Sequence, residues 1–319
     1  MLNTLTPRAA VVIAALVLGL AAMPTSAQIG ETALFLQRFP RNFDRTELEQ
    51  DVVFQNEAGE VQAGVKCATR SVGDFERTMI EAAVGDMVEI QGHAQRFSGL
   101  TVPIVFHVAT TSAGVGNLTK KDIKRQIRVL KKAYVSHGIR FRLQGIRRYQ
   151  DDEFATGCAD EDIEKKFKAR NAVDPANTLN VYTCIPSNGY LGWAFFPWEL
   201  PEDSFMHGVV LHHSTLPRGS AAPYNLGKTL THEIGHYLGL YHTFQGSCSD
   251  GDLVADTPAE QGPAYGCPVP RDTCSAPGQD SVRNFMNYTD DSCMKQFTPG
   301  QGERMLDLVA TFRPSLQSS

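Results

Sequence analysis

Apolar positions along the chain change their period several times, and each period predicts one type of element. The run TVPIVFHVATT, which begins at Thr101, is rich in β-branched residues and predicts a buried strand. Ile123, Ile127 and Leu130 then recur at helical spacing, which predicts an amphipathic helix. The next run, IRFRLQGI, alternates apolar and polar residues and predicts a half-exposed strand.

Capping and turn residues delimit these elements. Thr119 and Asp122 are spaced as a capping pair at the start of the helix, and Gly138 is a natural stop at its end. Residues 245–300 are rich in Gly, Pro, Asp and Cys, which predicts irregular structure. Further strands are predicted over 178–185 and 207–213, and a closing helix over 305–312.

The N-terminus has the three-part pattern of a secretory signal peptide. Arg8 precedes an uncharged, mostly apolar run over 9–22, and small residues follow at Thr25 and Ala27. We expect cleavage after Ala27. The alternative is a membrane anchor, but the apolar run is shorter than the ~20 residues that a spanning helix needs. No other stretch is apolar enough to span a bilayer, so we expect a soluble, extracellular protein.

Composition narrows the class of protein. The chain is 42% hydrophobic, which is enough for a sizeable core, and its formal net charge is −5, which argues against a nucleic-acid-binding protein. It holds seven cysteines, and an oxidising compartment favours their pairing. Six can pair, so one is left over and has to be explained.

The most informative stretch is HEIGHYLGLYH, residues 232–242. His232 and His236 are four positions apart, so a helix presents both imidazoles on one face. Gly239 allows the helix to end in a left-handed turn, after which His242 can supply a third ligand. Three neutral ligands and a water molecule are typical of a catalytic zinc site. Glu233, next to the first ligand, is then placed to take a proton from that water.

Several further segments carry a family resemblance. The extended histidine motif with a downstream methionine turn is the signature of metzincin metalloproteases. HEIGHYLGLYHTF, GDLVADTP, NFMNYTDDSC, FTPGQ and LGWAFFP together resemble the pappalysin family of metzincins, the M43-type secreted endopeptidases, over roughly residues 100–315. The resemblance implies an α+β zinc protease domain. It would have a twisted mixed β-sheet, a backing helix, an active-site helix and an irregular, disulfide-rich C-terminal subdomain.

The resemblance also implies roles for residues near the metal. Met286 would form the hydrophobic base beneath the zinc histidines, and Tyr288 would hydrogen-bond the oxyanion.

By spacing alone, the four cysteines of the loop-rich part allow three connectivities. The resemblance implies Cys248–Cys274 and Cys267–Cys293. Cys158 and Cys184, which flank a helical stretch and a strand, are candidates for a third bridge.

Cys67, in VKCATR, is the cysteine left over. A thiolate is a strong zinc ligand, so it can occupy the open zinc position in a latent precursor. Pappalysin-like precursors carry a similar switch, usually with Gly after the Cys, where this chain has Ala68. A free thiol and an intermolecular disulfide are the alternatives.

The expected organisation is a signal peptide over 1–27, a propeptide over 28–96 and a catalytic domain over 97–319. We expect an activating protease to cleave the chain between propeptide and catalytic domain, near Arg96.

Acidic residues gather in CSDGDLVADTP without a basic residue. Oxygen ligands on a loop suit calcium, and GDLVADTP resembles the family's calcium-binding segment. Asp252, Asp256 and Thr257 are the candidate ligands. A solvated acidic loop is the alternative.

We therefore expect a secreted, zinc-dependent endopeptidase that acts on proteins or peptides and is made as a latent precursor. One catalytic Zn²⁺ is expected, with neither a nucleic-acid partner nor a membrane span. The first alternative is a secreted, non-catalytic zinc-binding or adhesion module on a metzincin shell, although pure metal binding does not require Glu233. The second is another hydrolase on the same zinc, such as an amidase.

Overall fold

The computed structural model describes residues 48–91 and 99–317, and it divides the chain into two compact units. One unit comprises Val72–Arg96, with residues further upstream, and its described part is formed by helix α3 (Asp74–Gln91). The other, larger unit comprises Phe43–Ser71 and Phe97–Ser319 and contains the histidine motif. The predicted signal peptide and the expected cleavage site at Arg96 lie outside the described residues.

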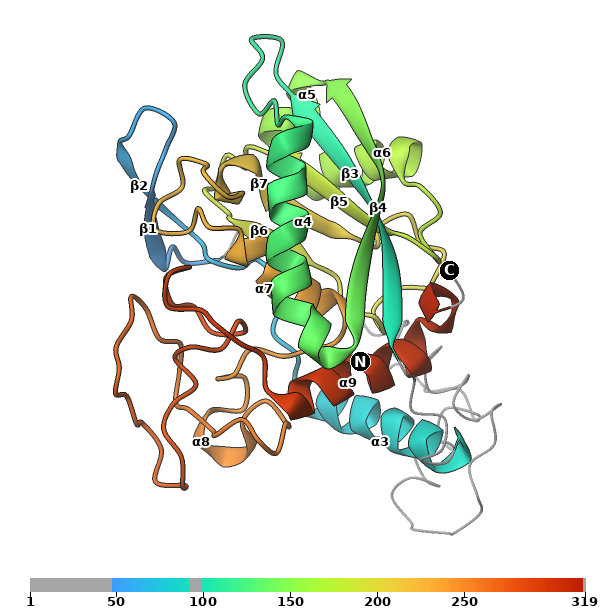
Figure 1. The fold of residues 1–319 in the computed structure, drawn as a ribbon, viewed down its shortest axis with the longest axis vertical. Coiled ribbons are helices and arrows are strands. Elements are labelled where there is room, and N and C mark those ends of the chain that lie inside the picture. Colours follow the sequence, from blue (N-terminus) through green and yellow to red (C-terminus); the bar gives the residue numbers. More distant parts are fainter. Residues whose placement is uncertain (1–47, 92–98, 318–319) are drawn as a thin grey trace, which may run out of the picture. The chain divides into compact units, whose positions relative to one another are not determined.

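A five-stranded mixed sheet forms the centre of the larger unit (Figure 1). Its order is β4-β3-β5-β7-β6, and all neighbours are parallel except β6, which lies antiparallel to β7 at one edge. The mixed sheet confirms the predicted fold class. The strands are β3 (Leu100–Thr110), β4 (Ile139–Gln150), β5 (Leu179–Cys184), β6 (Gly192–Ala194) and β7 (Val209–His212).

Helix α4 (Lys120–Tyr134) lies against one face of this sheet (Figure 1). Thr119 and Asp122 form the expected capping box, and Gly138 has a φ of +73° where the chain turns into β4. The apolar side of the helix is buried in the main core. At its end, Tyr134 Oη donates a hydrogen bond of 2.7 Å to the Thr231 carbonyl in α7 (Lys228–Tyr237). The backing helix therefore supports the helix that carries the histidines.

The opposite side of the sheet has a second core with helices α5 (Asp152–Gly157) and α6 (Glu161–Asn171). A Cys158–Cys184 disulfide joins these helices to β5. In α6, Glu164 and Lys168 form an ion pair of 2.6 Å with no exposed side-chain surface. Trp193 of β6 donates a hydrogen bond of 3.1 Å to Glu164. This hydrogen bond holds the edge strand β6, which lies beside the histidine cluster, against α6.

After α7 the chain is mostly irregular, as predicted. The regular elements of this part are the short α8 (Ser247–Asp250), the closing helix α9 (Pro299–Phe312) and a 3₁₀ turn over Pro314–Gln317. Two disulfides, Cys248–Cys274 and Cys267–Cys293, tie its loops together. Among the described residues, no helix has the length and apolar character needed to cross a bilayer.

The hairpin that precedes Cys67 was not predicted from the sequence. Residues 52–64 form an antiparallel hairpin of β1 (Val52–Gln55) and β2 (Val61–Gly64). The hairpin leads directly into Cys67.

Candidate metal centre

Three histidines converge at the end of α7. His232 and His236 lie on successive turns of the helix, and Gly239, with a φ of +104°, turns the chain so that His242 faces them. The Nε2 atom of His236 is 3.1 Å from that of His232 and 3.0 Å from that of His242. All three side chains are buried. The structure thus brings the three predicted ligands together at one point.

Backbone carbonyls set the tautomers of two of these imidazoles. The Nδ1 atom of His232 lies 2.7 Å from the Phe285 carbonyl, and that of His236 lies 2.7 Å from the Leu240 carbonyl. A carbonyl can only accept, so each Nδ1 carries the proton and each Nε2 presents a lone pair to the centre.

The electrostatics of the three rings favour a bound cation. Burial lowers the pKa of all three histidines, that of His236 to about 4, so the rings are neutral at physiological pH. Lone pairs facing one another within about 3 Å repel unless a cation lies between them. The donor set, three neutral imidazoles of which two have their tautomer set by a backbone carbonyl, fits zinc.

Met286, the residue expected beneath the histidines, is fully buried, and its side chain lies against Gly235 of α7. A Cβ atom added at Gly235 would lie 2.3 Å from the Met286 sulfur, so glycine leaves the space that this side chain occupies against α7. This role of Gly235 was not predicted from the sequence.

Tyr288 lies beside the cluster, with its ring centroid 4.9 Å from that of His242, and burial raises its pKa well above the usual value. Its phenol therefore stays protonated and can donate a hydrogen bond.

Glu233 is fully buried next to the histidines, and two residues of the segment after β2 contact it. Its Oε2 atom accepts a hydrogen bond of 2.9 Å from Thr69 Oγ1 and lies 3.5 Å from Cys67 Sγ. The candidate ligand atoms of Cys67 and the three histidines all lie within 4.8 Å of one another. Burial and the Glu233 carboxylate raise the pKa of the Cys67 thiol, whereas a metal ion at this point would favour the thiolate.

The segment of residues 65–69 makes backbone hydrogen bonds to the chain at and just before β6, with an isolated parallel bridge between Val65 and Tyr190. The Val65 amide donates to the Gly189 carbonyl at 3.2 Å, and the Val65 carbonyl accepts from the Leu191 amide at 3.0 Å. The Ala68 amide donates to the Gly192 carbonyl at 2.9 Å. This backbone pairing holds residues 65–69, which we call the covering segment, across the histidine cluster.

Lys66 occupies a buried acidic pocket beside the cluster. Its side chain is 1% exposed, and its Nζ lies 3.7 Å from Asp291 Oδ1 and 3.7 Å from the centre of the Tyr224 ring. The other oxygen of Asp291 accepts amide hydrogens from Leu226 and Lys228 at the start of α7. Burial lowers the pKa of Lys66 and raises that of Asp291, and the opposite charge of the partner counteracts both shifts. This pair was not predicted from the sequence.

The three candidate calcium ligands have unusual polar environments. Asp252 is 2% exposed, and burial raises its pKa to about 7 despite a hydrogen bond from the Val254 amide. Asp256 accepts a hydrogen bond of 2.9 Å from the Gly300 amide. Thr257 Oγ1 is buried and has no hydrogen-bond partner among the described residues. A buried carboxylate and an unsatisfied hydroxyl are compatible with a cation, which would supply the missing interaction.

Comparisons with known proteins agree with this geometry. The family model Peptidase_M43, described as pregnancy-associated plasma protein-A, matches residues 162–310. An extracellular metalloprotease of Pyricularia oryzae is 40% identical over 227 residues, covering 69% of this chain and 78% of the relative. An extracellular metalloprotease of Colletotrichum graminicola is 38% identical over 270 residues, covering 80% and 95%.

Two solved structures are similar as well. Mature mirolysin of Tannerella forsythia, in complex with a cleaved peptide, has a TM-score of 0.62 and 32% identity and covers 69% of this chain and 96% of its own. A mutant of promirolysin from the same organism has a TM-score of 0.66 and 28% identity and covers 77% and 92%. The precursor thus matches a larger share of this chain than the mature protein does.

Proposed function

The chain belongs to the M43 family of metalloproteases, and from this premise we propose that the cluster of His232, His236 and His242 is the zinc centre of a pappalysin-like endopeptidase. The protein is a secreted, zinc-dependent endopeptidase made as a precursor. The observation that carries the site assignment is the convergence of three histidine Nε2 atoms beside the buried Glu233 carboxylate.

In the proposed mechanism, this chain's residues handle the protons around the scissile bond. Bound zinc supplies Lewis acidity toward the substrate carbonyl and a water molecule. Glu233 takes a proton from the attacking water and passes it to the leaving amine. Tyr288, protonated because burial raises its pKa, donates a hydrogen bond to the developing oxyanion. Met286 keeps the base of the cluster dry.

Latency is proposed to come from the segment that pairs with β6. Cys67 lies among the three candidate zinc ligands, so its sulfur would hold the metal in place of a water molecule, and Thr69 donates a hydrogen bond to the carboxylate that would act as base. We assign residues 28–96 to the propeptide and 97–319 to the catalytic domain. An activating protease then has to cut between them, so that the covering segment can leave.

The pocket around Asp291 is proposed to select the side chain next to the scissile bond. It holds Lys66, which directly precedes the residue at the metal centre, between a carboxylate and an aromatic ring. A desolvated carboxylate and a ring face both favour an ammonium or guanidinium group. When the covering segment leaves, the pocket is free for a lysine or arginine of the substrate.

Calcium is proposed as a second, structural ion, with Asp252, Asp256 and Thr257 among its ligands. The raised pKa of Asp252 and the unsatisfied Thr257 hydroxyl support the proposal, because a cation would stabilise the ionised carboxylate and give the hydroxyl oxygen a partner.

The first prediction concerns Glu233→Ala in the processed protein. The variant should keep the fold and one zinc per chain but lose casein cleavage by at least about a hundredfold, because the general base is gone. Metal content and cleavage are measured with and without a zinc chelator. Glu161→Ala, which removes an exposed carboxylate from α6, is the control and should stay active. A zinc-loaded Glu233→Ala protein with normal activity would rule out the mechanism and favour a different base.

The second prediction concerns latency. The Cys67→Ala precursor should cleave casein before processing, because nothing then excludes water from the metal. Val61→Ala, which truncates a side chain that is 71% exposed in the same hairpin, should stay latent. Unchanged latency of the Cys67→Ala precursor, with zinc bound, would reject the cysteine switch.

The third prediction concerns specificity. Asp291→Asn should reduce kcat/KM at least about tenfold for peptides with lysine next to the scissile bond, because the pocket loses its charge. The asparagine oxygen can still accept the amide hydrogens that Asp291 accepts. Matched peptides with norleucine, which has the length of lysine without its charge, should be affected less. Equal losses for both peptides would remove the pocket from substrate recognition.

The fourth prediction concerns calcium and pH. The pKa of Asp252 is raised from 3.8 to about 7 on folding, so without calcium the folded state should lose stability as pH rises from about 4 to 7. Calcium should remove this loss by stabilising the ionised carboxylate. Thermal unfolding is followed at pH 5 and 7.5 with and without Ca²⁺, with Asp252→Asn as the comparison. If calcium leaves the melting temperature of the unmodified protein unchanged at pH 7.5, the site does not bind it.

A further inference from the structure

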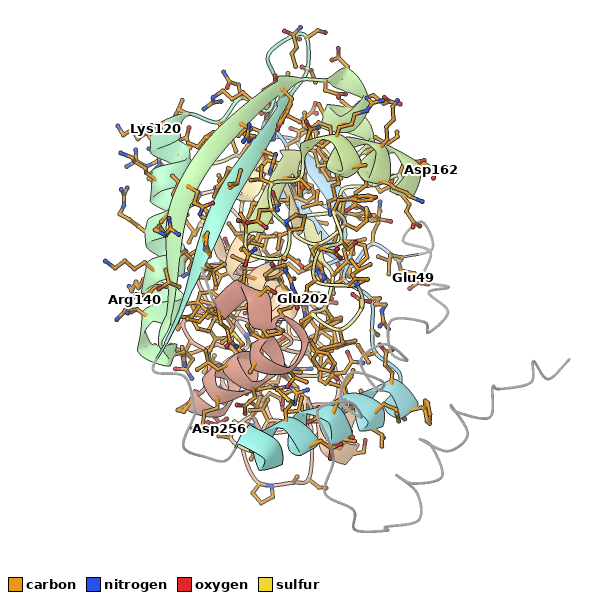
Figure 2. The ribbon with its side chains drawn as sticks, turned by 90° about the vertical axis from the view of Figure 1, so that its right-hand side faces the viewer. Glu49, Lys120, Arg140, Asp162, Glu202 and Asp256 are labelled. Carbon is orange, nitrogen blue, oxygen red and sulfur yellow. A yellow bond between two sulfur atoms is a disulfide. The ribbon has the colours of Figure 1, made fainter. Side chains whose placement is uncertain are left out.

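Helix α4 exposes cationic side chains alone. Every exposed residue of the helix is Lys or Arg: Lys120, Lys121, Lys124, Arg128, Lys131 and Lys132. At 3.6 residues per turn these six positions fall within an arc of about 120°, and they extend over about 18 Å of helix. Figure 2 shows nitrogen-tipped side chains pointing outward along this edge of the molecule, with Lys120 near one end and Arg140 of β4 near the other. We call the six residues, together with the neighbouring Arg148 of β4, the cationic face.

The charge of this region contrasts with that of the whole chain. Residues 120–150 contain eleven Lys and Arg and a single acidic residue, Asp122, whereas the rest of the chain contains nineteen cationic and 34 acidic residues. The region therefore carries a formal charge of +10 in a chain of −5. Asp122 caps the helix and pairs with Arg125, so it does not neutralise the exposed cations.

Helix stability does not account for this arrangement. Lys120 and Lys124, and likewise Lys124 and Arg128, are like charges four positions apart, which destabilise a helix. The solvated helix α6 differs at its exposed charged positions, which mix acids and bases: Glu161, Asp162, Lys165, Lys166 and Arg170. A helix that only has to be soluble in this molecule thus has both signs of charge, whereas α4 has one.

The cationic face is directed away from the metal centre. The opposite side of α4 packs in the core, where Gln126 donates a hydrogen bond of 2.9 Å to the Gly227 carbonyl at the start of α7. The face therefore cannot contribute to the proposed chemistry, but it can hold the enzyme next to a partner without blocking the cleft.

A hollow lies at one end of the cationic face. It has a volume of about 400 Å³ and lies between Lys120 and Arg148, with Gln144 and Gly145 of β4 among its lining residues. It coincides with an irregularity in the pairing of β3 with β4, where the register shifts between Ile104 and Val105. Arg148 is oriented by a hydrogen bond of 2.9 Å to the side chain of Asn117. Two cations and an amide around a hollow can hold a polar ring that carries an anionic group.

We propose that the cationic face binds a linear acidic polysaccharide and so anchors this secreted protease to an extracellular polymer. A row of cations along one helix complements a polymer with regularly repeated sulfate or carboxylate groups. An anionic membrane is a poorer partner, because the apolar side of α4 is buried and no exposed apolar side chain on this helix can insert. Single-stranded nucleic acid is also a poorer partner, because no exposed residue of α4 is aromatic and can stack on a base.

The proposal is tested with the full secreted protein and two fluorescent probes. Heparin fragments provide sulfate groups, and oligogalacturonate provides carboxylates alone. Binding is followed by anisotropy in about 50 to 300 mM NaCl. We expect binding to at least one probe that weakens as salt rises, because exposed charges are screened. The two probes distinguish the sulfated from the carboxylated form of the partner.

Two variants with equal changes in net charge locate the site. The triple variant Lys124→Gln, Arg128→Gln, Lys131→Gln should bind about tenfold more weakly, since three exposed ion pairs are lost. The control Lys165→Gln, Lys166→Gln, Arg170→Gln on α6 should bind as the unmodified protein does. Glutamine has nearly the helix propensity of lysine and arginine, so both should fold, which thermal unfolding verifies. Peptide cleavage by the processed forms should be unchanged in both.

Several results would overturn the proposal. One is the absence of binding to both polysaccharides at the lowest salt concentration, and another is an equal loss in the two triple variants, which would indicate non-specific charge attraction. Tighter binding to phosphatidylserine vesicles or to DNA would assign the face to another partner. If the α4 variant unfolds, Lys124→Arg with Lys131→Arg serves instead. It must retain binding, and losing it would contradict a charge-based site.

Discussion

Two hydrogen bonds from imidazoles to carbonyls determine the chemistry of the metal centre. His232 donates to the Phe285 carbonyl and His236 to the Leu240 carbonyl, and both Nε2 lone pairs consequently face the same point. Phe285 lies in the irregular part of the chain, and Leu240 lies in the turn after α7. The ligand geometry therefore exists only once the disulfide-tied loops have packed against α7. This dependence explains why a region with so little regular structure needs two disulfides.

Backbone hydrogen bonds also determine where the side chains of the covering segment lie. Residues 65–69 are held by backbone hydrogen bonds to Gly189, Leu191 and Gly192. Cys67 and Thr69 both approach Glu233, whereas Lys66 points into the pocket of Asp291. One short segment thus occupies the metal position, the proposed base and the proposed specificity pocket together. Releasing the segment would free all three.

Helix α4 connects this centre to the surface. Its apolar side holds α7 in place through contacts such as Tyr134 to Thr231, and its outer side carries the row of cations. The helical period predicted the buried side correctly, and the capping box of Thr119 with Asp122 was evident from the residues alone. The hollow between Lys120 and Arg148 could not be predicted from the sequence, because it depends on the shift in register between β3 and β4.

The spacing of residues along the sequence determined which groups form the metal centre. The period of the α-helix places His232 and His236 on one face whatever surrounds them, and Gly239 marks the turn toward the third histidine. The tertiary structure alone decided which of three disulfide connectivities forms and which side chain reaches Glu233. Cys67 lies 166 positions from that carboxylate, and no local pattern encodes a contact over such a distance. The sequence specified the groups that a zinc site requires, whereas chain packing decided what covers them, because only the folded backbone brings distant segments within hydrogen-bonding range.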